Sequence, residues 1–186
     1  MQWTNDAKSY GWLTIALHWI AALGIGLMLV VGLRADFLKE ASDRAGFLEA
    51  IGWHISIGAT LIAFLAAQVI QYYAQKQPAP PEQPRPLQLL ALTTHHLLLL
   101  AIALLIVSGP MLVWSNGRVI SVWGWFAIPS PFAARNHDVH EIAETVHAIG
   151  RYMLYGLIPL HVLGVLKHLI IDRDGVMARM LAPKRG

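Results

Sequence analysis

The sequence contains no cysteine and little charge. Only 13% of its 186 residues are Asp, Glu, Lys or Arg, about half the share of a typical soluble domain. The lack of thiols excludes disulfides, thiolate ligation of haem, iron–sulfur clusters held by this chain and cysteine-based zinc sites. The scarcity of charge, together with 56% hydrophobic residues, argues against a soluble domain and predicts a membrane protein.

Four apolar runs are each long enough to cross a bilayer, which takes about 20 helical residues. They cover residues 12–33, 47–73, 87–114 and 139–171. The connections are 34–46, 75–86 and 115–138, and the second of these contains five prolines, so it is not helical throughout. Asn136 and Asp138 are candidate caps for the fourth helix. We predict one all-α domain over residues 1–186, a four-helix transmembrane bundle.

Basic residues predict how the bundle is oriented. With four spans, both termini and the proline-rich connection lie on one side, which carries the excess of Lys and Arg. Acidic residues dilute the basic ones on the other side. The positive-inside rule therefore places both termini in the cytoplasm.

Most of the nine histidines fall inside the proposed spans. Such a group is costly in a membrane and usually faces the bundle interior with a partner. His147 and His161 lie fourteen residues apart, which is about 21 Å and nearly four turns, so they share a helix face. By depth, His147 is level with His54, and His161 is level with His18. The spacing predicts two cross-bundle histidine pairs, one in each leaflet.

Paired imidazoles suit a b-type haem, which is held without covalent bonds. Two axial imidazoles leave no open position on the iron, an arrangement that favours electron transfer over oxygen binding, and bundle cores commonly house such sites. Small residues near the ligands would make room for a flat macrocycle; they are Gly58, Gly150 and Gly164.

Two alternatives remain at this point. His95 and His96 begin the third span at the depth of the inner pair, so spacing alone leaves the inner ligands ambiguous. A histidine-lined metal transporter is the second alternative, because four histidines follow a heptad spacing: His140, His147, His161 and His168. Such a transporter would usually add carboxylates within the spans, and no Asp or Glu lies deep in them.

Arg151 lies one turn deeper than His147 and stays charged in the membrane. An unpaired charge at that depth costs roughly 2.5–3.5 kcal/mol on insertion scales. We expect no carboxylate at its level, which leaves a haem propionate, most simply that of the outer haem, as its partner.

Short motifs recur in order along nearly the whole chain. They are Tyr10 followed by His18-Trp19, the HxxxG from His54 to Gly58, the proline-rich run ending at Pro81, His95 with Gly109, Trp123-Gly124, His147 with His161, and the closing stretches 166–168 and 172–181. In this order and at these distances the chain resembles the prokaryotic cytochrome b561 family, the small four-helix dihaem cytochromes of the bacterial inner membrane.

The resemblance implies two haem b groups and multi-pass insertion among inner-membrane lipids. The family's outer ligand pair carries over to His54 and His147, and its inner pair to His18 and His161 rather than His95. It also implies electron flow between a quinone such as ubiquinone and a small one-electron donor or periplasmic redox protein at the outer face. For the small stand-alone members superoxide is one such donor, which would make the chain an oxidoreductase. No nucleic-acid partner is expected.

The chain also departs from the family pattern. Gln68 stands where members commonly have Arg, Ile106 replaces a proline, and Ala148 stands where Glu often follows the outer ligand. These departures bear on the quinone pocket and the redox potentials. The alternative within electron transfer is a membrane-anchor cytochrome b subunit of a hydrogenase or dehydrogenase, with residues 115–138 as the docking surface. The compact chain favours the stand-alone interpretation.

Overall fold

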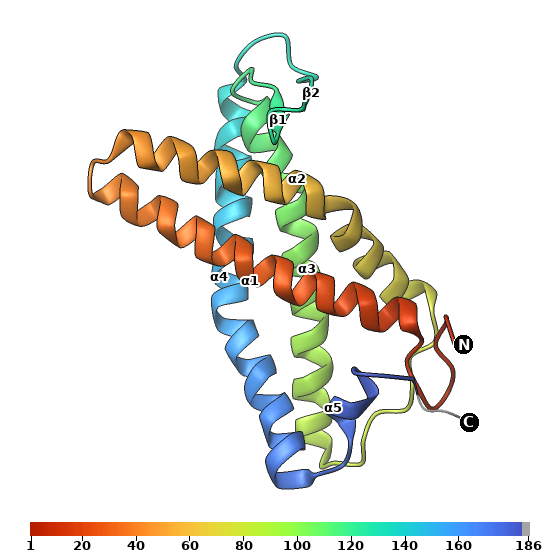
Figure 1. Cartoon of the computed structure of the whole chain (residues 1–186). Helices are drawn as coiled ribbons and strands as arrows, with labels where there is room; N and C mark the ends of the chain where they lie inside the picture. Colours follow the sequence, from red (N-terminus) through yellow and green to blue (C-terminus); the bar gives the residue numbers. More distant parts are fainter. Residues whose placement is uncertain (184–186) are drawn as a thin grey trace.

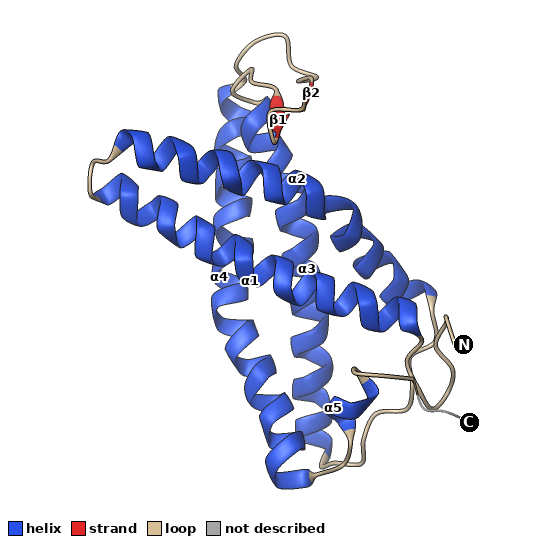
Figure 2. Ribbon diagram, viewed as in Figure 1, coloured by secondary structure: helices blue, strands red, loops and turns tan. Residues whose placement is uncertain are grey.

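The structure is a computed structural model that describes residues 1–183, and helices dominate it (Figures 1 and 2). The long helices are α1 (Trp12–Glu40), α2 (Arg44–Ala74), α3 (Arg85–Trp114) and α4 (His137–Leu166), and α4 continues into a π-helical turn, η1 (Lys167–Asp172). A short helix, α5 (Val176–Arg179), follows, and β1 (Ile120–Val122) pairs antiparallel with β2 (Phe126–Ile128). Four helices are long and apolar enough to cross a membrane. The predicted helical fold is confirmed, with one small hairpin added.

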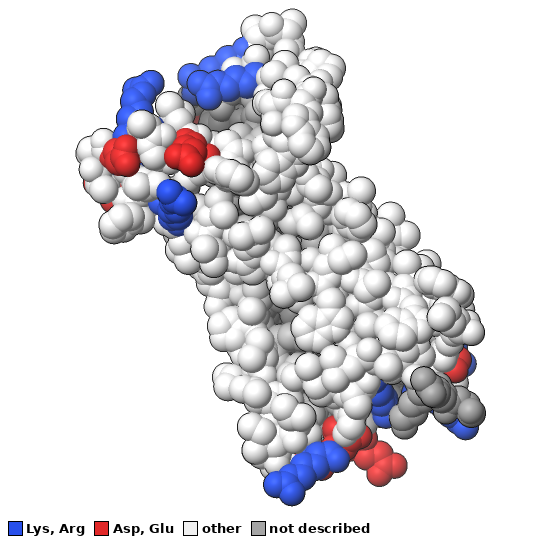
Figure 3. Space-filling view, in the orientation of Figure 1, with Lys and Arg blue, Asp and Glu red and all other residues white. Residues whose placement is uncertain are grey.

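The surface between the two ends of the bundle is almost free of charge (Figure 3). Large apolar side chains are exposed along the long helices, among them Leu23, Val30, Val107 and Leu163. In water such a surface would be unfavourable, whereas lipid tails cover it at no cost. The chain is therefore a multi-pass membrane protein.

The four helices form two hairpins. α1 packs against α2 and α3 packs against α4, and the two hairpins meet mainly where α2 contacts α3 (Figure 1). Ala21, Leu65 and Ile102 form the buried cluster where α1, α2 and α3 meet, with Ile25 and Leu61 packed against it. This apolar cluster lies midway along the bundle.

The connection expected at residues 34–46 is mostly helical, because α1 continues to Glu40. Residues 34–40 contain no Gly or Pro, and charged side chains do not end a helix once it has left the membrane. The turn is only three residues long, with Ser42 at a φ of 59°. Asp43 then caps α2 by accepting a hydrogen bond from the Gly46 N–H at 2.9 Å.

The connection expected at residues 115–138 contains the β1–β2 hairpin, which sequence reasoning had treated as a loop. Three residues, 123–125, connect the paired Val122 and Phe126. Trp123 and Gly124 have φ values of 54° and 73°, and the Trp125 N–H donates to the Val122 carbonyl at 3.0 Å, which closes the turn. Asn136 caps α4 by accepting from the Val139 N–H at 3.1 Å, as predicted for one of the two candidates.

The N-terminal residues and α5 lie at the same end of the bundle (Figure 1), where hydrogen bonds tie both segments to the connection between the hairpins. The Ala79 N–H donates to the Ala7 carbonyl at 3.2 Å, and Arg179 donates to the Ala79 carbonyl at 2.9 Å. Trp19 donates from Nε1 to the Met180 carbonyl at 2.6 Å. The chain ends and the proline-rich connection therefore close this end.

The closest approach of α4 to α3 requires a glycine. A Cβ at Gly150 would lie 2.9 Å from Leu105 Cγ and 3.4 Å from the Ala101 carbonyl oxygen. Leu105 Cγ is the branch point of its side chain, so it cannot move aside alone. At Gly156, on the same helix, a Cβ would meet nothing within 4 Å.

We expect Gly150→Ala to lower the free energy of unfolding by about 1–3 kcal/mol, the usual cost of overpacking. Gly156→Ala is the matched control, because it gains the same helix propensity without the clash. Thermal unfolding of the purified protein in detergent measures the difference. Equal midpoints for the two variants would contradict this account of the α3–α4 contact.

Candidate functional site

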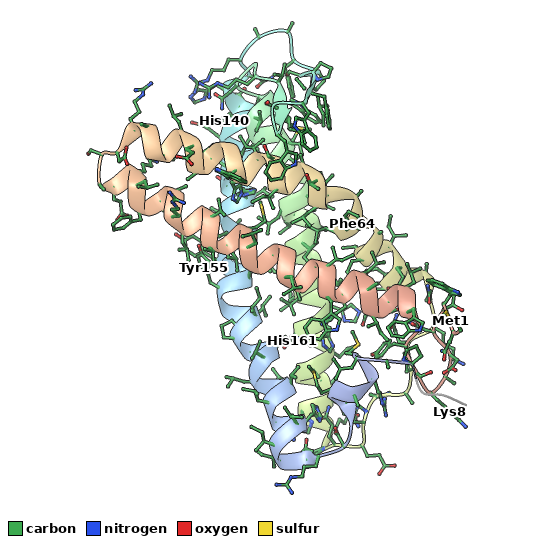
Figure 4. The ribbon with its side chains drawn as sticks, in the orientation of Figure 1. Met1, Lys8, Phe64, His140, Tyr155 and His161 are labelled. Atoms are coloured by element: carbon green, nitrogen blue, oxygen red, sulfur yellow. The ribbon has the colours of Figure 1, made fainter. Side chains whose placement is uncertain are left out.

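The structure brings together both histidine pairs that the sequence predicts. His54 on α2 faces His147 on α4, with ring centroids 6.2 Å apart and planes at 71°. His18 on α1 faces His161 on α4, with centroids 6.3 Å apart and planes at 58°. The two pairs lie on either side of the apolar cluster, and Figure 4 labels His161 on the half of α4 away from the hairpin.

The spacing of both pairs fits a metal held between the rings. A coordinating imidazole nitrogen lies about 2 Å from its metal, and the ring centre lies roughly 1 Å beyond, so two axial imidazoles have centroids about 6 Å apart. The separations of 6.2 and 6.3 Å agree with this value at both levels. The residues present therefore fit two bis-imidazole sites.

His95 fits less well as a ligand of the inner site. Its ring centroid lies 5.2 Å from that of His161, which is too close for a metal between two rings. The His96 ring packs against Tyr72 at 5.6 Å, and its Nδ1 bonds the Leu92 carbonyl at 2.8 Å. The geometry thus favours His18 as the partner of His161.

Two glycines lie against the rings of the outer pair. A Cβ at Gly32 on α1 would lie 3.6 Å from His54 Cε1, and one at Gly109 on α3 would lie 3.7 Å from His147 Cε1. Each ring is therefore flanked by the backbone of the partner helix in its own hairpin. This contact leaves the opposite side of the ring for a second ligand-bearing helix.

Two of the glycines expected to make room for a macrocycle also take part in helix packing. An added Cβ would meet Met28 at Gly58, at 3.2 Å, and Leu105 at Gly150, at 2.9 Å, and their role beside a macrocycle stays a prediction. Gly164 would meet nothing within 4 Å. Sequence spacing places a glycine on a helix but does not say which neighbour uses the space.

Ser108 on α3 is a contact that sequence reasoning missed. Its Oγ lies 3.0 Å from His147 Nδ1, and its hydroxyl donates to the Leu104 carbonyl at 2.7 Å. The sequence does contain a signal for this contact, because Ser108 carries the only hydroxyl between residues 97 and 114. An isolated polar residue in a membrane helix usually has a partner on another helix.

The expectation that no carboxylate lies level with Arg151 is wrong. Arg151 Nη1 lies 2.6 Å from Asp36 Oδ2, and the two side chains are 31% and 49% exposed. The pair forms because α1 continues past the predicted end of its span and carries Asp36 across to α4. Arg151 Nε remains buried without a hydrogen-bond partner. The guanidinium thus keeps a free donor one turn from His147.

The other two histidines of the heptad have local partners. His140 Nδ1 lies 3.1 Å from both Ser115 Oγ and Asn116 Nδ2. His168 Nδ1 lies 2.7 Å from Asp174 and 3.1 Å from Asp172. His140 and His168 therefore contact polar side chains at opposite ends of the bundle and belong to neither histidine pair.

The cluster around His168 is held by ion pairs. Lys167 Nζ lies 2.5 Å from the same Asp172 carboxylate, so an ammonium already neutralises it. Burial alone raises the pKa of Asp174, but hydrogen bonds from the Val176 N–H and the His168 side chain lower that pKa by more. Asp174 therefore stays ionised beside His168 over the physiological pH range.

Comparison with known proteins agrees with this geometry. The family model described as prokaryotic cytochrome b561 matches residues 9–183. Cytochrome b561 homolog 2 of Escherichia coli strain K12 is 30% identical over 97% of this chain and 95% of its own length. The probable superoxide oxidase CybB of Yersinia pestis is 25% identical, covering 96% and 99% of the two chains. Cytochrome b561 homolog 1 of the same E. coli strain is 27% identical, covering 92% and 95%.

Helices, histidine spacing and family match therefore lead to one conclusion. The chain belongs to the prokaryotic cytochrome b561 family of membrane electron-transfer proteins.

Proposed function

We propose that this chain carries electrons across the bacterial inner membrane through two haem b groups, from a one-electron donor at the outer face to membrane ubiquinone. The observation that carries the proposal is the pair of facing imidazoles at each of two levels, 6.2 and 6.3 Å apart. A haem held in this way supplies a one-electron couple with no open position on its iron.

The chain's own residues set the path. His147 and His161 belong to one helix, which also contains Pro159, and their separation along its axis is about 21 Å. His54 and His18 complete the two sites from the other hairpin. The apolar cluster of Ala21, Leu65 and Ile102 packs α1, α2 and α3 together between the two levels.

Superoxide is the donor that we propose. The support is the relative from Y. pestis, which is described as a probable superoxide oxidase and aligns over nearly its full length. In this reaction two superoxide anions each lose one electron and become dioxygen. One quinone gains both electrons and two protons and becomes quinol. The four histidines would bind the haem groups through which the electrons pass. Superoxide would be oxidised at the outer face.

An anchor subunit of a larger respiratory enzyme is the second candidate. The hairpin at the outer end supports it, because Trp125 and Phe126 are 84% and 58% exposed there. Aromatic residues of this kind are enriched in protein interfaces. Copurification of a large periplasmic enzyme with the native protein would favour this function over the stand-alone one.

The first prediction concerns the ligands. Purified protein should contain about two low-spin haems per chain, and His147→Ala or His161→Ala should each remove about one of them. His140→Ala and His95→Ala are the controls and should retain both. Haem quantified against protein, with the reduced spectrum, measures this. Colourless folded protein that moves divalent metals in liposomes would favour the transporter instead.

The second prediction concerns turnover. Superoxide generated around the purified protein should reduce its haem, and a soluble ubiquinone analogue should reoxidise it with formation of quinol. His54→Ala should abolish superoxide-driven quinol formation because it breaks the outer site. Haem that superoxide leaves oxidised, in protein that dithionite reduces fully, would rule out superoxide as the donor.

The third prediction concerns Arg151. We propose that its free Nε binds a propionate of the outer haem while Nη1 stays with Asp36. A positive charge there disfavours the oxidised haem, so Arg151→Gln should lower one midpoint potential by about 40 mV, the equivalent of about 1 kcal/mol for a one-electron couple. Lys39→Gln, an exposed change at the same end, is the control. Unchanged potentials in Arg151→Gln would refute the proposal.

A further inference from the structure

We infer that Ser108 is the positioning residue of the outer site: its hydroxyl orients the His147 imidazole and makes it the stronger electron donor of the outer pair. The inference rests on the proposed function, since it assumes that His147 binds haem iron. Ser108 belongs to α3, a helix that supplies none of the four proposed ligands. The outer site would then depend on three helices.

Both hydrogen bonds of Ser108 can form at the same time under one assignment of protons. The Ser108 hydroxyl donates to the Leu104 carbonyl at 2.7 Å, so its proton is used within α3. Its oxygen can then only accept from His147 Nδ1, which lies 3.0 Å away. Nδ1 therefore carries the proton, and the lone pair of the neutral ring is on Nε2. This is the tautomer that can bind a metal through Nε2.

Packing supports the same orientation. Ser108 is buried, with 2% of its surface exposed, so water does not compete for the bond. The next residue, Gly109, leaves space beside the ring, since an added Cβ there would lie 3.7 Å from His147 Cε1. The contact that orients the ring from α3 is therefore the hydrogen bond between Ser108 and Nδ1.

The opposite ligand has no side-chain partner of this kind among the described residues. His54 Nδ1 is buried near the Met28 carbonyl, whose geometry as an acceptor falls short of a normal hydrogen bond. An acceptor on Nδ1–H raises the basicity of a ligating imidazole. More electron density on the ligand favours oxidised iron, so Ser108 should lower the potential of the outer haem.

The chain contains a matched internal control. Ser115, the C-cap of α3, lies seven residues after Ser108. Its Oγ lies 3.1 Å from Nδ1 of His140, which is seven residues before His147 on α4. Both serines are buried, with 0% and 2% exposed. Both contacts join a buried serine hydroxyl to Nδ1 of a histidine on α4, where His140 has Asn116 as a further neighbour, and only His147 is a proposed ligand.

The experiment is a redox titration of both haems in purified wild type, Ser108→Ala, Ser108→Thr and Ser115→Ala, with electron paramagnetic resonance of the oxidised proteins. Ser108→Ala should raise one midpoint potential, with a severalfold change in the oxidised-to-reduced ratio of that haem at a fixed potential. The low-spin signal of the same haem should shift. Ser108→Thr, which keeps the hydroxyl, should restore both values, and Ser115→Ala should match wild type.

The outcomes separate this inference from the function on which it rests. A wild type that binds no haem would refute both. Two bound haems with unchanged potentials and signals in Ser108→Ala would refute the inference alone. The inference would also fail if Ser115→Ala gave the same shift in midpoint potential, or if Ser108→Ala shifted the potentials of both haems equally. Either result would indicate a general effect on the bundle. Ser108→Ala that loses haem while Ser108→Thr keeps it would support the positioning role.

Discussion

Polar groups inside a bilayer must find their partners within the protein, and the arrangement of this bundle follows from that requirement. The backbone meets it by forming four long helices. The side chains meet it by turning inward, where imidazoles face imidazoles, Ser108 bonds His147 and Arg151 reaches Asp36. The surface that faces lipid is then apolar. Both the apolar surface and the polar interior follow from the need of polar groups for partners within the protein.

The two candidate sites also bear on how the bundle holds together. Each takes one imidazole from α4 and one from the α1–α2 hairpin, so each joins two hairpins that otherwise meet mainly through α2 and α3. A ligand bridging them at two levels, as proposed, would add contacts where helix packing is sparse. Binding of the cofactor and assembly of the bundle would then be coupled, as they are in proteins whose metal sites span separate elements.

Sequence reasoning predicted what depends on periodicity and hydropathy. The four helices and both facing histidine pairs follow from runs of about 20 apolar residues and from the spacing of His147 and His161. It missed what depends on contacts between helices. The sequence analysis places Asp36 in a connection because the charged residues end the apolar run. In the structure α1 continues to Glu40 and includes Asp36. The partners of Ser108 and Gly150 lie on another helix, and no local pattern in the chain specifies them.

The hydrogen bonds that join the chain ends to the proline-rich connection impose an order on biosynthesis. Residues 1–83 contain a complete helical hairpin, and such a hairpin can insert into a membrane before the next one is made. Trp19 and Ala79, however, are bonded by Met180 and Arg179, which are synthesised after all four long helices. Until then the hairpins are joined by the connection and by lateral packing. This end of the bundle is therefore the last part to close, because its bonds join residues 161 and 100 positions apart in the chain.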